Sequence, residues 1–399
     1  MRSGILLAVV LGGTSGVVAD TIHVPGDYPT IQAGMDAAQA GDTVLVADGI
    51  YTGRGNKNLI YTGVPLTLRS ENGAESCIID CEGIGLGFWL ALNEPPDFII
   101  DGFTIRNGNS GWAGAFFFHH SCQAIIRNCV ITQCTSTFGG ALYCEDTSSP
   151  TLINCVITAN TAIRGGGLFI QHSSSPTLIN CTITNNIADT NGGGVYVISG
   201  GTNPRFINCT ITDNLAKRSG GGFYVANGDA VIVNSIVRRN TGGQITDNSE
   251  NLTVRYSNVE GGWPGQGNID ADPLFVDPDN GDYHLSPGSP SIDAADNTAV
   301  PKGIDTDLDG RNRFVDTRCT DDTGKGKPPI VDMGAYEFQV FQVTCPWDVD
   351  CNGSVGAADL LELLVSWGPC KGCPADFNHN GNVGASELLA LLANWGPCP

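Results

Sequence analysis

Short runs of alternating apolar and polar residues recur along the middle of the chain at a nearly constant interval. The segments TLINCVIT, TLINCTIT and RFINCTIT begin at residues 151, 177 and 205, so they lie 26 and 28 residues apart. Alternation with period two predicts β-strands, because amphipathic helices would show a 3.6-residue period. A repeat of this length that contains several short strands is one rung of a β-solenoid, whose rungs stack about 4.8 Å apart.

Asparagine and cysteine recur in columns of this repeat. The columns are Asn128, Asn154, Asn180, Asn208 and Asn234; Asn160, Asn186, Asn214 and Asn240; and Cys129, Cys155, Cys181 and Cys209. At Asn154 the alternation changes phase, which requires a sharp bend, and asparagine tolerates the left-handed backbone of such a bend. The cysteines are expected to face the core as small apolar fillers, although the rung spacing would also permit disulfides between neighbours.

The segment IHVPGDYPTIQAGMDAAQAGDTVLVADGIY, residues 22–51, resembles the N-terminal cap of the pectate-lyase-like β-helix superfamily. In that superfamily a helix, here roughly Ile31–Ala40, plugs the open end of the solenoid and covers its sheet edge. The strings DGFTIRNG and VDMGAYEF resemble a rung and the closing segment. The resemblance implies a right-handed parallel β-helix over residues 20–338. It specifies no single activity, because the superfamily includes lyases, glycoside hydrolases, esterases, epimerases and non-enzymes.

Residues 345–370 and 373–398 are two copies of one unit, and each copy has a loop with oxygen-bearing side chains at alternate positions, as in an EF-hand. The first loop offers Asp348, Asp350, Asn352, Ser354 and Asp359, and the second offers Asp376, Asn378, Asn380, Asn382 and Glu387. One helix is predicted after each loop. Its apolar face is expected to contain Leu360, Leu361 and Leu364 in the first copy and Leu388, Leu389 and Leu392 in the second.

The duplicated unit, residues 339–399, resembles a type I dockerin. The resemblance implies two bound Ca²⁺ ions and docking to a cohesin-like protein or a cell-surface anchor. The unit departs from that family in its cysteines, its terminal Trp-Gly-Pro-Cys and the low carboxylate content of its second loop, which predicts weaker calcium binding there. A metal-free knot of Asx turns is the alternative interpretation.

The module cysteines are predicted to pair as Cys345–Cys398 and Cys370–Cys373. Each helix takes the chain about 15 Å away from its loop, so a bond from Cys345 to Cys370 would have to span nearly a whole helix. If the two helices pack antiparallel, as in a dockerin-like duplicate, the end of each helix lies beside the start of the other loop. One disulfide within each repeat is the competing pattern.

An outward-facing aromatic column follows the glycine corner of the solenoid repeat. It contains Phe117, Tyr143, Phe169, Tyr196 and Tyr224. Aromatic faces stack on sugar rings, so the column would suit polysaccharide binding. A self-stacking ladder, or a patch that loops cover, explains the same pattern equally well.

A set of titratable residues lies beside this column. His119 and Glu145 share its outward parity, while His120, Asp146 and His172 follow one position later at intervals of 26. Neighbouring rungs would bring these imidazoles and carboxylates within a few ångströms, where they would support general acid–base catalysis or hold a metal. A solvated strand end with chance polar residues is the alternative. A calcium-loop-like string, Asp305–Asp316, is expected to be a plain turn because Asn312 replaces the usual apolar residue.

The N-terminus predicts a signal peptide over residues 1–19, with Arg2 before the apolar stretch Ile5–Leu11 and small residues before Asp20. The protein is therefore expected to be secreted or at the cell surface, where disulfides are permitted. No other stretch is long enough to predict a transmembrane span. The net charge of −21 disfavours nucleic-acid binding. It also disfavours direct capture of an acidic polysaccharide unless calcium bridges the two.

These patterns predict a secreted carbohydrate-active protein that binds or cleaves polysaccharide and docks through a calcium-dependent module. As an enzyme it would be a pectate-lyase-like polysaccharide lyase or a glycoside hydrolase. The alternative is a non-catalytic, adhesin-like surface scaffold, because the rungs also resemble polymorphic outer-membrane-protein repeats. A calcium-dependent lyase would need a basic residue beside its carboxylates, and the spacing places none there.

Overall fold

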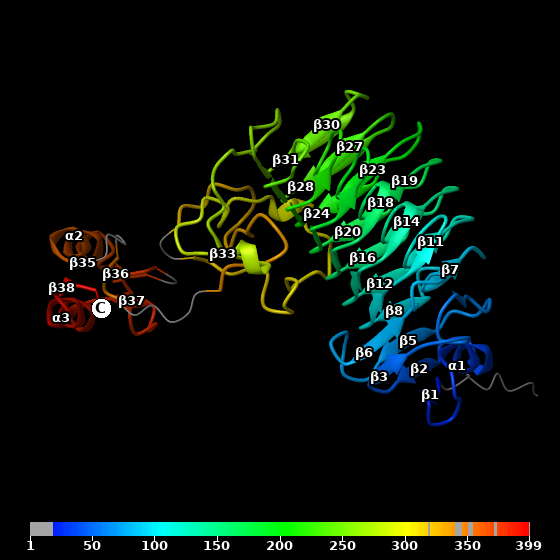
Figure 1. The fold of residues 1–399 in the computed structure, drawn as a ribbon. Helices are drawn as coiled ribbons and strands as arrows, with labels where there is room; N and C mark the ends of the chain where they lie inside the picture. Colours follow the sequence, from blue (N-terminus) through cyan, green and yellow to red (C-terminus); the bar gives the residue numbers. More distant parts are fainter. Residues whose placement is uncertain (1–18, 318–319, 340–344, 350–353, 371–372, 399) are drawn as a thin grey trace, which may run out of the picture.

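The computed structural model describes residues 19–317, 320–339, 345–349, 354–370 and 373–398 (Figure 1). These residues form a parallel β-solenoid, a closing segment and a small C-terminal module. The predicted signal peptide up to residue 18 lies outside the described residues, as do the predicted calcium ligands Asp350 and Asn352.

Four parallel sheets run along the solenoid, and among the described residues they contain 10, 9, 8 and 5 strands. The first sheet consists of β1 (Thr21–Val24), β2 (Thr43–Val46), β5 (Thr67–Ser70), β8 (Ile99–Asp101), β12 (Ile125–Arg127), β16 (Thr151–Ile153), β20 (Thr177–Ile179), β24 (Arg205–Ile207), β28 (Ala230–Val233) and β31 (Leu252–Arg255). The second consists of β3 (Gly49–Tyr51), β6 (Cys77–Asp80), β9 (Thr104–Arg106), β13 (Val130–Thr132), β17 (Val156–Thr158), β21 (Thr182–Thr184), β25 (Thr210–Thr212), β29 (Ile236–Arg238) and β32 (Asn258–Val259).

The third sheet is the one that positions the candidate site. It consists of β4 (Leu59–Ile60), β7 (Phe88–Leu90), β11 (Phe116–Phe118), β15 (Leu142–Cys144), β19 (Leu168–Ile170), β23 (Val195–Val197), β27 (Phe223–Val225) and β30 (Ile245–Asp247). The fourth consists of β10 (Asn109–Ser110), β14 (Thr135–Phe138), β18 (Thr161–Arg164), β22 (Ile187–Ala188) and β26 (Leu215–Ala216). Ile125 pairs with Thr151 and Leu142 with Leu168, so the register confirms rungs of about 26 residues.

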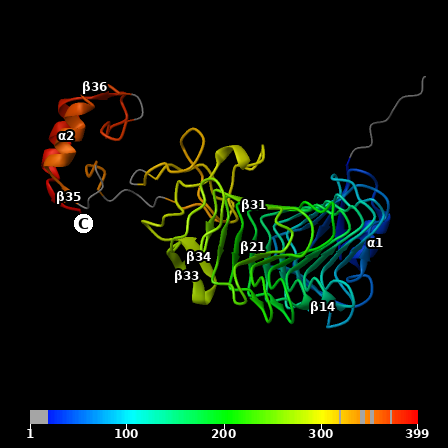
Figure 2. The same ribbon diagram turned by 90° about the horizontal axis from the view of Figure 1, so that it is seen from above.

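Helix α1 (Ile31–Ala37) lies at the N-terminal end of the solenoid, where Figure 2 shows it against the first rungs. The hydroxyl of Thr30 caps it by accepting a hydrogen bond from the backbone N–H of Ala33 (3.3 Å), and Ile31 and Met35 are buried. The helix ends three residues before the predicted Ala40, because Ala38 adopts an extended backbone.

Of the three repeated columns, the cysteines and one set of asparagines lie in the interior, and the other asparagines form a corner. Cys129, Cys155 and Cys181 are buried and unpaired, and burial raises the pKa of each thiol well above its usual value, so they act as core fillers rather than reactive groups. The internal asparagines form a ladder: the amide nitrogen of Asn186 donates to the side-chain oxygen of Asn214 at 3.0 Å. The corner asparagines all have left-handed φ, 52° at Asn154.

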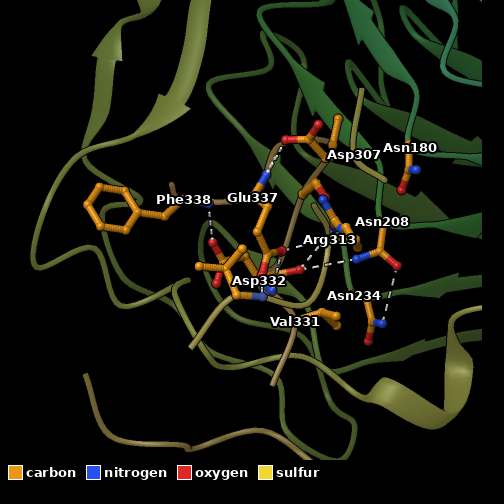
Figure 3. A network of polar contacts seen from close by, with 12 residues as sticks. Asn180, Asn208, Asn234, Asp307, Arg313, Val331, Asp332, Glu337 and Phe338 are labelled. Atoms are coloured by element: carbon orange, nitrogen blue, oxygen red, sulfur yellow. Dashed lines mark hydrogen bonds and ion pairs between the residues drawn. The ribbon is translucent and has the colours of Figure 1, made fainter. Parts of the chain in front are cut away.

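The closing segment docks on this corner (Figure 3). It includes β33 (Phe275–Asp277), η1 (Pro278–Asn280), β34 (Asp282–Leu285) and η2 (Asn297–Ala299). The side-chain amide of Asn208 donates to the backbone carbonyl of Asp332 (3.1 Å), and that of Asn234 donates to the carbonyl of Asp296 (2.9 Å). The repeated asparagines thus supply donors both to their own ladder and to the segment that covers it.

Within the calcium-loop-like string Asp305–Asp316, the chain turns back on itself between Thr306 and Asn312, which form an antiparallel bridge. Both side-chain oxygens of Asp307 accept backbone hydrogen bonds, one from Asp309 and Arg311 and the other from Glu337. These donors satisfy the buried carboxylate of Asp307. The bond from Glu337 also ties the string to the end of the closing segment.

The C-terminal module contains α2 (Ala357–Val365) and α3 (Ala385–Ala393). Two short antiparallel ladders join the copies: β35 (Ser354–Val355) pairs with β38 (Gly396–Pro397), and β36 (Gly368–Pro369) pairs with β37 (Asn382–Val383). The structure joins Cys345 to Cys398 and Cys370 to Cys373, with Cα–Cα distances of 5.6 and 5.8 Å. These are the same pairs as in the sequence-based prediction.

The prediction for the helix faces was wrong in part. Leu363 and Leu391 are the fully buried leucines of α2 and α3, with Leu360 and Leu388 packed beside them. Leucines predicted for the inner face are instead exposed, namely Leu361, Leu364, Leu389 and Leu392. Each helix is apolar over more than half of its circumference, so periodicity alone did not separate the core face from the exposed one. Among the described residues, the helices are all too short or too polar to cross a bilayer.

Candidate functional site

The candidate site lies at the C-terminal ends of β11, β15 and β19, where the third sheet turns into the first. The first residue after each strand extends the ladder: the N–H of Glu145 donates to the carbonyl of Phe118 at 3.0 Å. The next residue is left-handed in all three rungs, with φ of 50° at His120, 54° at Asp146 and 50° at His172. This repeated corner turns polar side chains of three rungs toward one another.

Glu145 is the centre of the site. Its carboxylate accepts hydrogen bonds from the Tyr143 hydroxyl (2.8 Å) and the Gln171 amide (3.0 Å). Two imidazoles flank it, with His119 Nε2 at 3.5 Å from Oε1 and His172 Nδ1 at 3.4 Å from Oε2. Only 16% of the side chain is exposed, so these contacts fix its orientation.

Asp146 extends the cluster toward solvent. Its Oδ2 lies 3.8 Å from His119 Nε2 and 3.6 Å from His120 Nε2. The other ring nitrogen of His120 lies 3.1 Å from the backbone carbonyl of Ala91, which orients the ring. The structure therefore brings all five predicted acid–base residues together, in the order His172, Glu145, His119, Asp146 and His120. One ligand atom each of His119, His120 and Asp146 lies within 4.8 Å of the other two, a spacing that a metal ion could also bridge.

The sequence analysis missed two members of this site. Gln171 occupies the column of His119 and Glu145, 26 residues after Glu145, so the repeat itself carried the signal. Tyr143 was assigned to the aromatic column, yet its hydroxyl contacts Glu145 and the Gln171 amide. Burial, and then the charge of Glu145, raises the pKa of Tyr143, so the phenol stays protonated and donates.

The aromatic column is covered, so of its two interpretations the structure favours the self-stacking ladder over the sugar-binding track. At most 9% of any of its five residues is exposed: Phe117, Tyr143, Phe169, Tyr196 and Tyr224. The rings stack from rung to rung, with centroids 5.0 Å apart between Tyr196 and Tyr224, and side chains such as Phe138 and Ile198 pack over them. The column is therefore a self-stacking ladder that neighbouring side chains cover, because these aromatic faces have no open side left for a sugar.

Two tryptophans at the edge of the ladder do reach solvent. Trp89 on β7 pairs in register with Phe117 and is 39% exposed, and Trp112 is 49% exposed. Their ring centroids lie 4.5 Å from Phe117 and 5.8 Å from Tyr143, next to the His119 and Glu145 positions. Trp89 occupies the predicted aromatic column one rung earlier, a signal that the sequence analysis did not use.

The second predicted calcium loop presents hard oxygen ligands. Glu387 and Asp376 are buried, and the charge of Asp376 acts on Glu387. Burial raises the pKa of Glu387, but hydrogen bonds from the Gly384 N–H and the Ser386 hydroxyl outweigh it, so the pKa lies below its usual value. Asn378 also contacts Glu387. Two buried carboxylates with an adjacent amide fit a calcium ion by their chemistry.

In the first predicted calcium loop, the carboxylate at the last position caps the helix that follows. Asp359 accepts hydrogen bonds from the N–H groups of Val349 (2.6 Å) and Gly356 (2.7 Å), and so fixes the start of α2. Glu387 does the same at α3 by accepting from Gly384 at 2.8 Å. Each loop is thereby tied to the helix that follows it.

The solenoid belongs to a known family. A family model described as "Right handed beta helix region" matches residues 46–211 and 166–271, which is more than half of the chain, so the protein belongs to the right-handed β-helix family. No curated protein matches the sequence. Pectate lyase Pel9A has a TM-score of 0.49 at 16% identity, covering 82% of this chain and 98% of that one. A mutant of the PL6 family alginate lyase AlyGC has a TM-score of 0.31 at 15% identity, covering 60% and 40%.

Proposed function

We propose that the protein is a secreted enzyme that cleaves a polysaccharide by general acid–base catalysis at Glu145 and its flanking histidines. The observation that carries this proposal is the placement of Glu145, which is held by Tyr143 and Gln171 between two imidazoles. Structural ion pairs need one partner for each charge. Two carboxylates and three imidazoles in one chain of contacts instead offer several positions for a proton.

In this proposal His119 transfers the proton. Its Nε2 faces both Glu145 and Asp146, so the two carboxylates lie where an imidazolium would form. In β-elimination, neutral His119 accepts the proton of the C–H bond beside the uronate carboxylate, and the electron pair of that bond forms a C=C bond as the C–O bond to the leaving sugar breaks. In hydrolysis, His119 instead accepts the proton of the attacking water. In both reactions the imidazolium returns its proton to the leaving oxygen. Trp89 and Trp112 supply the exposed aromatic faces on which a sugar ring stacks. The family resemblance makes a polysaccharide lyase or a glycoside hydrolase the expected reaction class.

A panel of polysaccharides tests the proposal and separates the two reactions. Lysis by β-elimination produces unsaturated uronates that absorb at 235 nm, whereas hydrolysis produces reducing ends alone. We expect one substrate to give a signal that His119→Ala abolishes. His23→Ala is the control and should leave the signal unchanged, because His23 is exposed on β1, the first strand of the solenoid, and not on the strands that carry the site. Absence of any product from the wild-type protein across neutral and acidic polysaccharides, with and without calcium, would reject the enzyme.

A non-catalytic surface scaffold is the second candidate. About half of each of the side chains of His120, Asp146 and His172 is exposed, as expected for polar residues at a strand end in solvent. A hollow of 910 Å³ near α1 is lined in part by Gln32, Arg54 and Lys57, and its lining includes no residue of the acid–base cluster. Polysaccharide binding without turnover would favour this function.

We further propose that the C-terminal module binds two calcium ions and docks to a cohesin-like partner or a cell-surface anchor. The duplicated loops supply the ligands, and the helices supply an exposed apolar surface. That surface consists of Leu361, Leu364, Trp367, Leu389, Leu392 and Trp395. Replacing Leu361 and Leu389 with lysine is expected to abolish retention on the native cell surface. The matched control is lysine at Glu362, an exposed polar position of α2.

A further inference from the structure

Three carboxylates from separate parts of the closing segment meet at its surface. They belong to Asp293, Asp316 and Asp322, and one oxygen of each lies within 4.8 Å of the other two. Asp316 and Asp322 are exposed, whereas Asp293 is fully buried beneath them. None of the three belongs to the acid–base cluster or to the C-terminal loops.

The backbone fixes this arrangement. The N–H groups of Thr323 and Gly324 donate to the carbonyl of Asp293 at 3.0 and 3.1 Å, which holds Asp322 beside it. The N–H of Asp293 in turn donates to the side chain of buried Asp332 at 2.8 Å. Asp293 adopts a left-handed φ of 51°, a conformation that aspartate tolerates better than most residues. The carboxylates are therefore positioned by the fold of the segment itself.

The side chain of Asp293 is unusual because both of its oxygens are buried without a hydrogen-bond partner among the described residues. The other buried aspartates of the segment are satisfied: Asp332 accepts from two backbone N–H groups, and Asp307 from three. An unsatisfied buried carboxylate is costly, and its oxygens require a proton or a cation. Burial, followed by the charges of Asp332, Asp322 and Asp316, raises the pKa of Asp293 to about 8, and the nearby Thr317 N–H opposes this shift only in part.

We propose that Asp293, Asp316 and Asp322 bind a divalent cation, and that this cation is calcium. The donor set consists of carboxylate oxygens, which hard cations prefer over zinc or copper. Ligands of one calcium ion lie about 2.3–2.6 Å from it, so two of them are separated by at most about 5 Å, as the three carboxylates are. Calcium accepts the irregular geometry and additional waters that two exposed ligands imply, whereas magnesium requires a near-ideal octahedron. The ion would satisfy Asp293 and bind residues 293, 316 and 322 together, and so stabilise the closure of the solenoid.

The test must separate this site from the C-terminal loops, so it uses the full chain with Asp348→Asn and Asp376→Asn as the parent. Thermal unfolding of this parent is followed by circular dichroism of the strands, in EGTA and in millimolar CaCl₂. We expect calcium to raise the Tm of the strand transition by at least about 2–4 °C, because the ion binds only the folded closing segment. Adding Asp316→Asn and Asp322→Asn should remove this shift.

The matched control is Asp321→Asn, which removes one exposed negative charge next to Asp322 and leaves the three carboxylates in place. It should retain the calcium shift. Magnesium at the same concentration should give less than half of the shift. Equal stabilisation of the parent and the Asp316→Asn/Asp322→Asn variant by calcium would overturn the proposal, and so would no stabilisation of the parent. Calorimetric titration of the parent should show one ion bound per chain.

Discussion

The hydroxyl of Tyr143 donates a 2.8 Å hydrogen bond to the Oε2 atom of Glu145, two residues further along the same rung. Tyr143 is a member of the covered aromatic ladder, and Glu145 is the first residue beyond the strand. One side chain therefore connects the packed layer outside the third sheet to the candidate site. The orientation of Glu145 depends on this ladder as well as on its own rung.

Tyr143→Phe tests this connection. The ring and its stacking remain, but Glu145 loses a donor, so we expect turnover to fall by about 10-fold, corresponding to one hydrogen bond to a charged group. Tm should change by no more than a few degrees. Tyr224→Phe is the matched control, because its hydroxyl accepts from Asn248 in the same ladder, away from Glu145. A loss of turnover in both variants, or in neither, would contradict the connection.

The internal asparagine ladder predicts a large effect on stability. The amide nitrogen of Asn186 donates to the carbonyl of Ile157 and to the side chain of Asn214, and its side-chain oxygen accepts from Asn160. Asn186→Ala leaves several of these buried groups unpaired, so we expect the free energy of unfolding to fall by about 2–4 kcal/mol. Chemical denaturation measures it. Asn251→Ala, at an exposed position, should change it by less than about 0.5 kcal/mol.

The stability of the closing segment should depend on pH in the absence of calcium. Burial and neighbouring charges raise the pKa of Asp293 to about 8, and burial raises that of Asp332 to about 7. A raised pKa means that the folded state binds more protons than the unfolded state between about pH 4 and 8, so stability falls as the pH rises through this window. Tm measured in EGTA should therefore decrease from pH 5 to 8. Asp293→Asn should reduce the slope, and an unchanged slope would assign the effect to other groups.

The rungs and their corners could be predicted because they depend on local rules that repeat. The left-handed bend at Asn154, the buried Cys155 and the approach of His119 to Glu145 all follow from strand parity and a fixed interval. The burial of the aromatic column could not be predicted in this way. Whether the ladder is exposed depends on how side chains of other strands, such as Phe138 on β14, pack against it, and strand parity does not give that packing.

The sequence predicted that a closing segment exists, but it did not predict which residues of that segment come together. Asp293, Asp316 and Asp322 meet because of hydrogen bonds between residues separated by up to 39 positions, such as Asp293 to Asp332. No spacing rule connects them, whereas the string Asp305–Asp316 matched a calcium-loop pattern and is a turn. The helices of the module show the same limit, because Leu361 and Leu363 are equally apolar and only packing separates them.

The C-terminal module should need calcium for its structure. Asp376 and Glu387 are buried close enough to repel one another, and an ion between them would remove that repulsion. We expect EGTA to reduce the helical signal of α2 and α3 in the full chain, and Asp376→Asn to reduce calcium uptake by one ion.

Peptide mapping without reduction should recover Cys345 linked to Cys398. A peptide linking Cys345 to Cys370 would instead place one disulfide in each repeat.

The most direct test of the acid–base site is the turnover of Glu145→Gln and Asp146→Asn on the polysaccharide that the wild-type protein cleaves. Both substitutions preserve shape, so Tm should remain within a few degrees of wild type. If Glu145 is the centre of the site, Glu145→Gln should reduce kcat by at least about 100-fold, and Asp146→Asn, which lacks contacts to Tyr143 and Gln171, should reduce it less. Wild-type kcat in a folded Glu145→Gln variant would contradict the account and place the chemistry elsewhere on the solenoid.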